Sequence, residues 1–471
     1  MILVLYLIIS IYLGRKNPYL YLLFPIALQQ GAAAFIDQSL TFGGKRIFSV
    51  YDTVFKDFLF FIVVLIGIFL LKIKFPKTGY LGSKLIILYF IYILTLFLVD
   101  LFTYKDAEEV LLTARTLIYG PLAYLLWLGI YSSVSRQQYE GFLRLLFYIT
   151  PISGMLYILN SSNIVTIFPR ELIYLEVEMD TTSSLRDFET IPLFLIPVIV
   201  ICFQSLLMPI FKLPKYLLYI NFFVLPIALL FTFTRSLLIM ASMQLIIMVI
   251  LICVNKGIAG FRQAGSFIVL FVLFSIPIYL SAQKMFPAQL EYFTGRFLNV
   301  SNEGMDEQNV DIRLSYIDKA IQITNYTSPA FGAGMSREYY RELNEVGAWT
   351  ADSTIPFFLY HTGWVGVAFL YLILAIFSLD SVFQFFKTGD WLIAYLSSNF
   401  ITLTIASLIM GGLNLNGSVW TFMNLALYTV IKCKLWKRAV SYIPVKDLKI
   451  AASLSSFKAN FYAHPRPDIQ E

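Results

Sequence analysis

An arginine between two long apolar runs is the first residue whose position calls for chemistry. Arg235 lies in Thr234-Arg235-Ser236, within the 39-residue stretch 216–254, which is otherwise mostly apolar. As one helix this stretch would be about 59 Å long, so the chain must turn near Arg235. A guanidinium near a bilayer is costly unless it is paired or hydrated. Arg235 is therefore predicted either to hold an anion in an outward-facing cavity or to reach lipid phosphates.

The largest polar segment of the chain, Gln283–Ser353, contains further candidate groups. Its 71 residues include six Lys or Arg side chains and ten Asp or Glu side chains. The residues around Arg313, from Asp311 to Ile321, have apolar positions at helical spacing, which predicts a helix. The later Pro329-Ala-Phe-Gly332-Ala-Gly334 sequence predicts a flexible turn that exposes backbone N–H groups, as phosphate-binding loops do, although Gly-x-Gly alone is unspecific.

The polar segment ends in Asp352-Ser353-Thr354, with Pro356 shortly after. Asp, Ser and Thr are common at helix N-caps and Pro is tolerated in the first turn, so these residues predict the start of a helix. His361 is the alternative base. It follows Asp352 by nine residues, so on one helix it would point to the opposite face and lie about 13 Å deeper. This placement favours a structural role for His361.

The composition indicates that these residues belong to an integral membrane protein. Hydrophobic residues make up 58% of the 471 residues and charged ones 14%, with a mean hydropathy of +0.74. Soluble domains carry about 25% charged residues. The three cysteines lie in or at the end of apolar runs, and with only two histidines the chain offers little for a zinc or iron site. We expect no metal and no cofactor.

The apolar runs predict an all-α, polytopic membrane helix bundle. A membrane-spanning helix needs about 20 apolar residues. Runs of usable length lie near 19–36, 58–72, 85–102, 116–134, 143–160, 191–211, 216–234, 237–254, 265–282, 355–379, 392–412 and 420–433. Residues 1–14 are a thirteenth candidate, though they would reach only about 20 Å.

The distribution of charge predicts the orientation of these helices. With the tail after Val430 and alternate loops placed inside, the inner side holds 21 Lys or Arg against 6 acids, and the outer side 14 against 23. Basic loops stay in the cytoplasm. The predicted organisation is transmembrane helices over 1–282 with an outer loop at 161–190, a large extracytoplasmic, partly helical loop at 283–353, transmembrane helices over 354–433, and a basic cytoplasmic tail at 434–471.

Two acidic features leave alternatives open. Glu176-Val-Glu178-Met-Asp180 in the outer loop could ligate a hard cation, because carboxylate oxygens suit calcium or magnesium, but a solvated acidic loop is favoured. Asp100 lies near the outer end of its apolar run. An acid at such a depth is either functional or reaches out to the membrane surface.

Several of these motifs together resemble the O-antigen ligase and O-antigen polymerase family of membrane glycosyltransferases (GT-C type). Thr234-Arg235-Ser236 is similar to the family's threonine/serine-arginine signature. Arg313, followed by the sequence from Pro329 to Gly334, is similar to the family's motif of an arginine, a proline and a Gly-x-Gly. Asp352-Ser353, nine residues and Gly363-Trp-Val-Gly366 match the spacing of the ligases' histidine motif. This chain has Asp352 where the ligases carry histidine, which favours a polymerase.

The resemblance implies a polysaccharide polymerase in the bacterial cytoplasmic membrane. It would join polyprenyl-diphosphate-linked repeat units of O-antigen, capsule or exopolysaccharide at the outer face. Arg235 and Arg313, with Arg296 third, would stabilise the diphosphate leaving group, because arginine binds phosphate strongly and stays protonated. Asp352 would be the general base, and no Asp-x-Asp motif occurs, in line with a metal-independent reaction. The predicted substrate-binding residues are Arg296, Gly332, Gly334, Arg337 and Ser353.

Two other functions remain open at this point. A ligase would move finished glycan to a different acceptor. A flippase or transporter would place charges or broken helices at the membrane centre, whereas most charges here lie in loops or at run ends. The resemblance also implies the lipid bilayer, a chain-length regulator and a flippase as partners, and nothing indicates nucleic-acid binding.

Overall fold

A computed structural model of the chain describes residues 76–103, 107–161, 191–230, 235–285, 305–335, 354–409 and 415–436, together with Tyr12 and Pro287. Every helix or strand that these ranges contain is an α-helix, which confirms the predicted all-α class for the described part of the chain. The helices are α5 (Leu81–Thr103), α6 (Ala107–Ser133), α7 (Arg136–Ser161), α8 (Ile191–Leu207), α9 (Lys215–Leu230), α10 (Arg235–Lys256), α11 (Ile258–Met285), α13 (Met305–Thr327), α15 (Thr354–Thr388), α16 (Trp391–Ile409) and α17 (Leu415–Lys432). The runs predicted near 19–36 and 58–72 lie outside the described residues.

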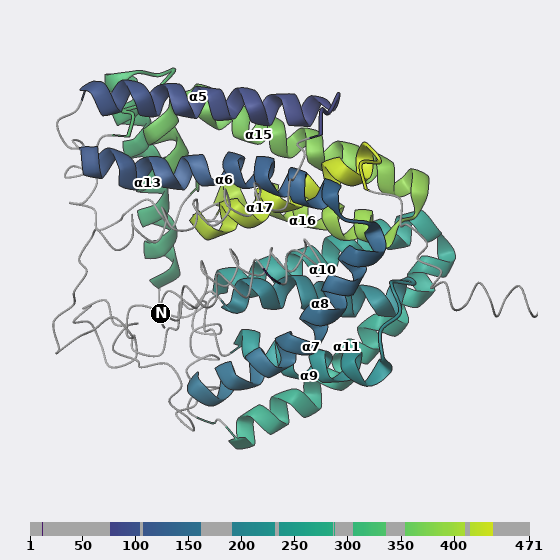
Figure 1. The fold of residues 1–471 in the computed structure, drawn as a ribbon. Coiled ribbons are helices and arrows are strands. Elements are labelled where there is room, and N and C mark those ends of the chain that lie inside the picture. The colour runs from purple at the N-terminus through teal and green to yellow at the C-terminus, as the bar shows by residue number, and fades with distance from the viewer. Residues whose placement is uncertain are drawn as a thin grey trace, which may run out of the picture.

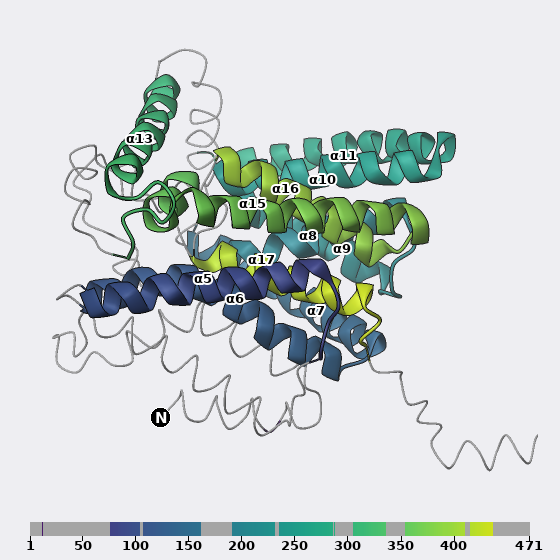
Figure 2. The same ribbon diagram turned by 90° about the horizontal axis from the view of Figure 1, so that it is seen from above.

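Most of these helices run side by side, and α13 lies across one end of the bundle (Figures 1 and 2). The pairs in most extensive contact are α6 with α17, α15 with α16, α10 with α16, and α7 with α9. We call the end that carries α13 the junction end. Short connections join α6 to α7, α8 to α9, α10 to α11 and α15 to α16 at the opposite end, which we call the connector end.

The outer surface of the bundle is apolar, as a membrane protein requires. Five of the described helices are long and apolar enough to cross a bilayer: α5, α7, α10, α15 and α16. On α5, Leu98 and Phe102 are exposed while Tyr89 and Ile93 are buried, so an apolar surface faces outward around an equally apolar core. A soluble protein rarely exposes such a continuous apolar face, whereas lipid covers it without cost. The fold is therefore that of an α-helical membrane protein.

Buried polar side chains tie the helices to one another inside this core. The hydroxyl of Tyr124 on α6 bonds to Ser83 of α5 and lies 3.0 Å from the Thr429 hydroxyl of α17. On α9, Asn221 donates to the Phe147 carbonyl of α7 at 2.8 Å. Each buried polar group needs such a partner, because an unpaired one costs the loss of its hydration. These bonds help to fix the register of neighbouring helices.

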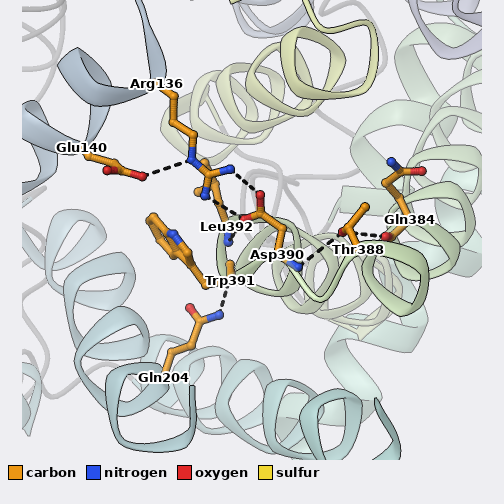
Figure 3. Close-up of polar contacts among 8 residues, drawn as sticks. All are labelled: Arg136, Glu140, Gln204, Gln384, Thr388, Asp390, Trp391 and Leu392. Atoms are coloured by element: carbon orange, nitrogen blue, oxygen red, sulfur yellow. Dashed lines mark hydrogen bonds and ion pairs between the residues drawn. The ribbon is translucent and has the colours of Figure 1, made fainter. Parts of the chain in front are cut away.

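At the connector end, partly exposed charges hold the ends of α7 and α16 together (Figure 3). Arg136 forms a two-point ion pair with Asp390, with Nη2 2.9 Å from Oδ1, and its Nε donates to Glu140 at 3.0 Å. Asp390 Oδ1 also accepts the Leu392 N–H at 2.9 Å, which caps α16. The guanidinium lies 5.8 Å from the ring centre of Trp436, so this residue, four positions after the end of α17, packs here as well.

Several element boundaries differ from those predicted. Gaps separate the predicted runs 116–134 and 143–160, 237–254 and 265–282, and 355–379 and 392–412. Helices fill most of these gaps, and only one or two residues connect α6 to α7, α10 to α11 and α15 to α16. The predicted boundary at 282 falls within α11, which ends at Met285. The stretch 216–254 is not one helix, as predicted, since α9 ends at Leu230 and α10 begins at Arg235, and the residues between them lie outside the described part of the chain. Polar residues extend these helices beyond the apolar runs, because the backbone hydrogen bonds of a helix do not depend on apolar side chains.

Candidate functional site at the junction end

The turn that follows α13, residues 328–335, packs into the junction end between α5 and α15 (Figure 2). Its two glycines have positive φ, 75° at Gly332 and 77° at Gly334. Side chains with a Cβ seldom adopt this conformation, so glycine is needed at both positions. Gly332, Ala333, Gly334 and Met335 are all buried. The segment predicted as a flexible, exposed turn is therefore a packed one.

The turn fits against a break in α15. Gly363 has φ 59° and ψ −169°, which interrupts the helix between Thr354 and Thr388. Such a break leaves carbonyl groups before it and N–H groups after it without their helix partners. The turn supplies the missing partners: Ala333 N–H donates to the Tyr360 carbonyl at 2.7 Å, and Trp364 N–H donates to the Pro329 carbonyl at 3.0 Å. A third bond joins the Val365 N–H to the Ala330 carbonyl at 3.3 Å.

Two glycines allow the backbones of the turn and the break to meet. A Cβ added to Gly332 would overlap the Tyr360 carbonyl oxygen and lie 2.7 Å from Gly363 N. A Cβ added to Gly363 would overlap the Ala330 carbonyl and lie 2.6 Å from Gly332 N. Each glycine therefore makes room for the other segment. Gly366 packs in the same way against the Thr362 side chain within α15.

Side chains from α5 and α15 hold the end of the turn from opposite sides. Asp100 of α5, only 8% exposed, accepts the Met335 N–H at 2.5 Å. His361 of α15 is fully buried, and its Nδ1 lies 2.6 Å from the Gly334 carbonyl oxygen. A carbonyl oxygen only accepts, so Nδ1 carries the proton. The rings of Phe357 and Tyr360 pack on the imidazole, each at 4.7 Å between ring centres.

Tyr92 ties the middle of α5 to the same break. Its hydroxyl donates to the Thr362 carbonyl at 2.5 Å, one residue before Gly363, and lies 3.5 Å from the Ala330 carbonyl. Its ring packs beside those of Phe331 and Phe369. From α13, the Thr324 hydroxyl donates to the Leu359 carbonyl at 3.1 Å. The turn, α5, α13 and α15 thus form one hydrogen-bonded unit, which we call the junction.

The structure places the two principal arginines on helices near the junction end. Arg235 is the first residue of α10, which begins at that end and runs toward the connector end. Arg313 lies in α13, the helix that crosses the junction end (Figure 1). The predicted helix around Arg313 is confirmed and is longer than predicted, from Met305 to Thr327. The side chains of both arginines lie outside the described part of the structure.

The other predicted residues divide into two groups. Arg296, Arg337, Asp352 and Ser353 lie outside the described residues. Gly332 and Gly334 are described, and they are positioned differently from the prediction. A phosphate-binding turn needs free N–H groups, but the Gly332 N–H donates to the Ser328 carbonyl at 2.7 Å, and those of Ala333 and Met335 are also used. α15 begins at Thr354, in agreement with the predicted helix start after Asp352-Ser353.

Sequence reasoning missed the partners that hold the turn. Asp100 was recognised as an unusual acid, but not as a contact of Met335. The structure excludes the idea that it reaches out to the membrane surface, because its carboxylate is buried against the turn. Tyr92 offered no signal among the many aromatic residues of the chain. The Gly363-x-x-Gly366 spacing was the available signal for the break in α15.

Comparison of the chain with models of protein families, with curated proteins and with solved structures gives no match in any of the three. The geometry of the junction and the residues of the chain itself are therefore the basis for a function.

Proposed function

We propose that this chain is a membrane glycosyltransferase of the polysaccharide polymerase type, which joins polyprenyl-diphosphate-linked repeat units at the outer face of the bacterial cytoplasmic membrane. The observation that carries the proposal is the interlock between two motif segments. Pro329–Gly334 and Gly363–Gly366 belong to the pattern that resembles this family, and they are paired backbone to backbone. This pairing brings two distant motif segments into direct contact, as the residues of one site would require.

The positions of the arginines support the same proposal. The junction anchors the C-terminal end of α13, the helix that contains Arg313, at the end of the bundle where α10 begins with Arg235. Charges on such anchored elements suit the stabilisation of a leaving group, because preorganised donors need no rearrangement when charge develops. Under the predicted topology, the excess of Lys and Arg in the inner loops and of Asp and Glu in the outer ones would put this end at the outer face of the membrane.

In the proposed reaction the acceptor sugar hydroxyl attacks the anomeric carbon of the lipid-linked donor. The new carbon–oxygen bond forms as the bond from that carbon to the phosphate oxygen breaks, and the diphosphate leaves with the electron pair. Arg235 and Arg313, with Arg296 and Arg337 as further ligands, would bind the growing negative charge. Asp352 would take the hydroxyl proton, with Ser353 beside it in the sequence. Gly332 and Gly334 contribute by allowing the turn to pack.

The decisive experiment is complementation of a deletion strain of the source bacterium. We expect Arg235→Ala and Arg313→Ala to reduce polymer by roughly a hundredfold and to leave single repeat units, since loss of one preorganised donor costs about that much. Arg262→Ala, an exposed arginine of α11 near the connector end, is the matched control and should give normal chains. Normal chain length in both arginine variants would exclude the arginine clamp.

The glycan profile also separates the alternative functions. Loss of a ligase leaves long chains on the carrier lipid, whereas loss of a polymerase leaves short ones. A purified chain that moves lipid-linked sugar across vesicles without lengthening it would be a flippase. For Asp352, the comparison is between Asp352→Asn and Asp352→Ala. An N-cap tolerates Asn and a general base does not, so an active Asn variant would leave Asp352 with the capping role alone.

A further inference from the structure

Asp100 is the buried acid that the proposed reaction does not use. It lies one turn before the end of α5 and is only 8% exposed, whereas its neighbours Val99 and Phe102 face outward. Burying a carboxyl group is unfavourable unless hydrogen bonds replace its hydration. Within the described part of the chain, Asp100 accepts one such bond, from the Met335 N–H. The carboxyl group therefore has a defined task at the end of the turn.

The Asp100 carboxylate packs against Gly334 as well as accepting the Met335 N–H. A Cβ on Gly334 would lie 2.5 Å from Asp100 Oδ2 and 2.8 Å from Oδ1, so this glycine is needed for the carboxylate to reach Met335. The carbonyl of the same Gly334 bonds to His361 at 2.6 Å. The peptide group between Gly334 and Met335 is thereby held through its oxygen by α15 and through its N–H by α5.

The turn held by this peptide group directly continues α13, the helix that contains Arg313. The start of the turn is fixed to α15, because Trp364 N–H bonds to the Pro329 carbonyl at 3.0 Å. Asp100 fixes its other end, at Met335. An acceptor on α5 therefore helps to hold the turn that anchors the helix with a proposed active-site arginine.

We propose that Asp100 is a positioning residue for the glycosyl transfer, acting as a hydrogen-bond acceptor that orients the Gly334–Met335 peptide and not as an acid or base. This inference rests on the proposed function, because the residues it positions are those of the proposed site. The acceptor role follows from the partner: a backbone N–H donates a hydrogen bond but does not ionise, and the carboxylate is packed against Gly334.

The test compares Asp100→Asn with Asp100→Ala in two measurements. An Asn side chain keeps an acceptor oxygen of the same reach, whereas Ala removes it. We expect Asp100→Asn to retain polymer formation within about threefold, and Asp100→Ala to lose at least tenfold per folded molecule. Hydrogen exchange followed by mass spectrometry on the purified chain should show the Met335 amide protected in the wild type and the Asn variant, and exchanging at least tenfold faster in the Ala variant.

Asp318 supplies the matched control, because it is an exposed carboxylate on α13. Asp318→Asn and Asp318→Ala should leave both measurements unchanged. If Asp100→Ala does not fold, Gly334→Ala perturbs the same contact from the turn. We expect Gly334→Ala alone to impair polymer formation and Met335 protection more than the same substitution does when it is combined with Asp100→Asn. The uncharged amide of Asn moves away from the added methyl group more readily than the carboxylate does.

Three results would overturn the proposal. An inactive Asp100→Asn with Met335 still protected would assign proton transfer to Asp100. Normal activity per folded molecule in Asp100→Ala, with only the amount of protein reduced, would make its role purely structural. Unchanged exchange at Met335 in Asp100→Ala would show that the contact holds nothing. A wild-type chain that lengthens no glycan would defeat the proposed function instead, and the exchange measurement would still decide whether Asp100 holds the turn.

Discussion

The two ends of the helix bundle are held together by different means. At the connector end, the ion pairs Arg136–Asp390 and Lys432–Asp380 join helix ends through long, partly exposed side chains. At the junction end, backbone groups bond directly to backbone groups across Gly332 and Gly363. Exposed ion pairs contribute little and adapt to substitution, whereas close backbone contact has no side chain that can move aside. The junction should therefore be rigid and intolerant of change, as a site that positions reactive groups requires.

Gly363→Ala should have the largest effect on this contrast. The conformation of Gly363 is one that residues with a Cβ almost never adopt, and the added methyl group would overlap the Ala330 carbonyl. We expect a loss of at least about 3 kcal/mol in the free energy of unfolding, measured by SDS titration of the purified chain. Gly265→Ala in α11 is the control, since a Cβ there meets nothing within 4 Å. It should be neutral or stabilising by about 0.5 kcal/mol.

Asp390→Ala should have the largest effect at the connector end. It removes the ion pair with Arg136 and the cap on the Leu392 N–H, for a loss of about 2 kcal/mol in the same titration. Asp390→Asn is its internal control. Asn is a good N-cap, so this variant should lose only about 0.5–1 kcal/mol. Equal losses in the two variants would show that the charge, and not the cap, dominates this end.

Tyr92→Phe tests how much the junction depends on a side chain. The substitution removes the bond to the Thr362 carbonyl and keeps the ring beside Phe331. We expect a loss of about 1 kcal/mol, less than for Gly363→Ala, because one hydrogen bond is lost and the backbone pairing stays. Tyr219→Phe, an exposed tyrosine of α9, should change nothing. A loss as large as that of Gly363→Ala would mean that the side chains, rather than the glycines, hold the junction.

Lys432→Met should have the smallest effect. Lys432 pairs with Asp380 at 2.7 Å, but Asp380 also accepts the Tyr428 hydroxyl at 2.8 Å and so keeps a partner. A partly exposed pair of this kind contributes about 0.5 kcal/mol. Lys84→Met, an exposed lysine of α5, is the control and should lie within experimental error of the wild type. A loss above 2 kcal/mol would show that the connector end is as intolerant as the junction.

The sequence was informative about features that depend on neighbouring residues. Runs near 85–102 and 392–412 correspond to α5 and α16, and the helix around Arg313 was predicted from its spacing. The turn at Pro329–Gly334 was located correctly, but its environment was not. Glycines at these positions are equally compatible with an exposed phosphate-binding loop and with a packed turn. Only the segment that packs against them decides between the two.

The candidate site was predicted less completely, for a related reason. Asp100 and Met335 are separated by 235 positions in the chain, and Tyr92 and Thr362 by 270. Neither pair shares a motif, and nothing in the sequence near one member points to the other. Their meeting follows from how α5 packs on α15, which depends on the whole bundle. The sequence alone therefore leaves two interpretations of Asp100 open, and its partner decides between them.

By itself, the sequence determined that this chain is an all-α membrane protein. A bilayer offers no water to an unpaired backbone, so long apolar runs have to form helices, and run length and loop charge are local properties. Only the tertiary structure decided that the turn after α13 fills the break in α15 and is held there by Asp100 and His361. That outcome depends on which backbones can approach closely. A close approach requires two segments that are distant in the sequence, so neither segment predicts it by itself.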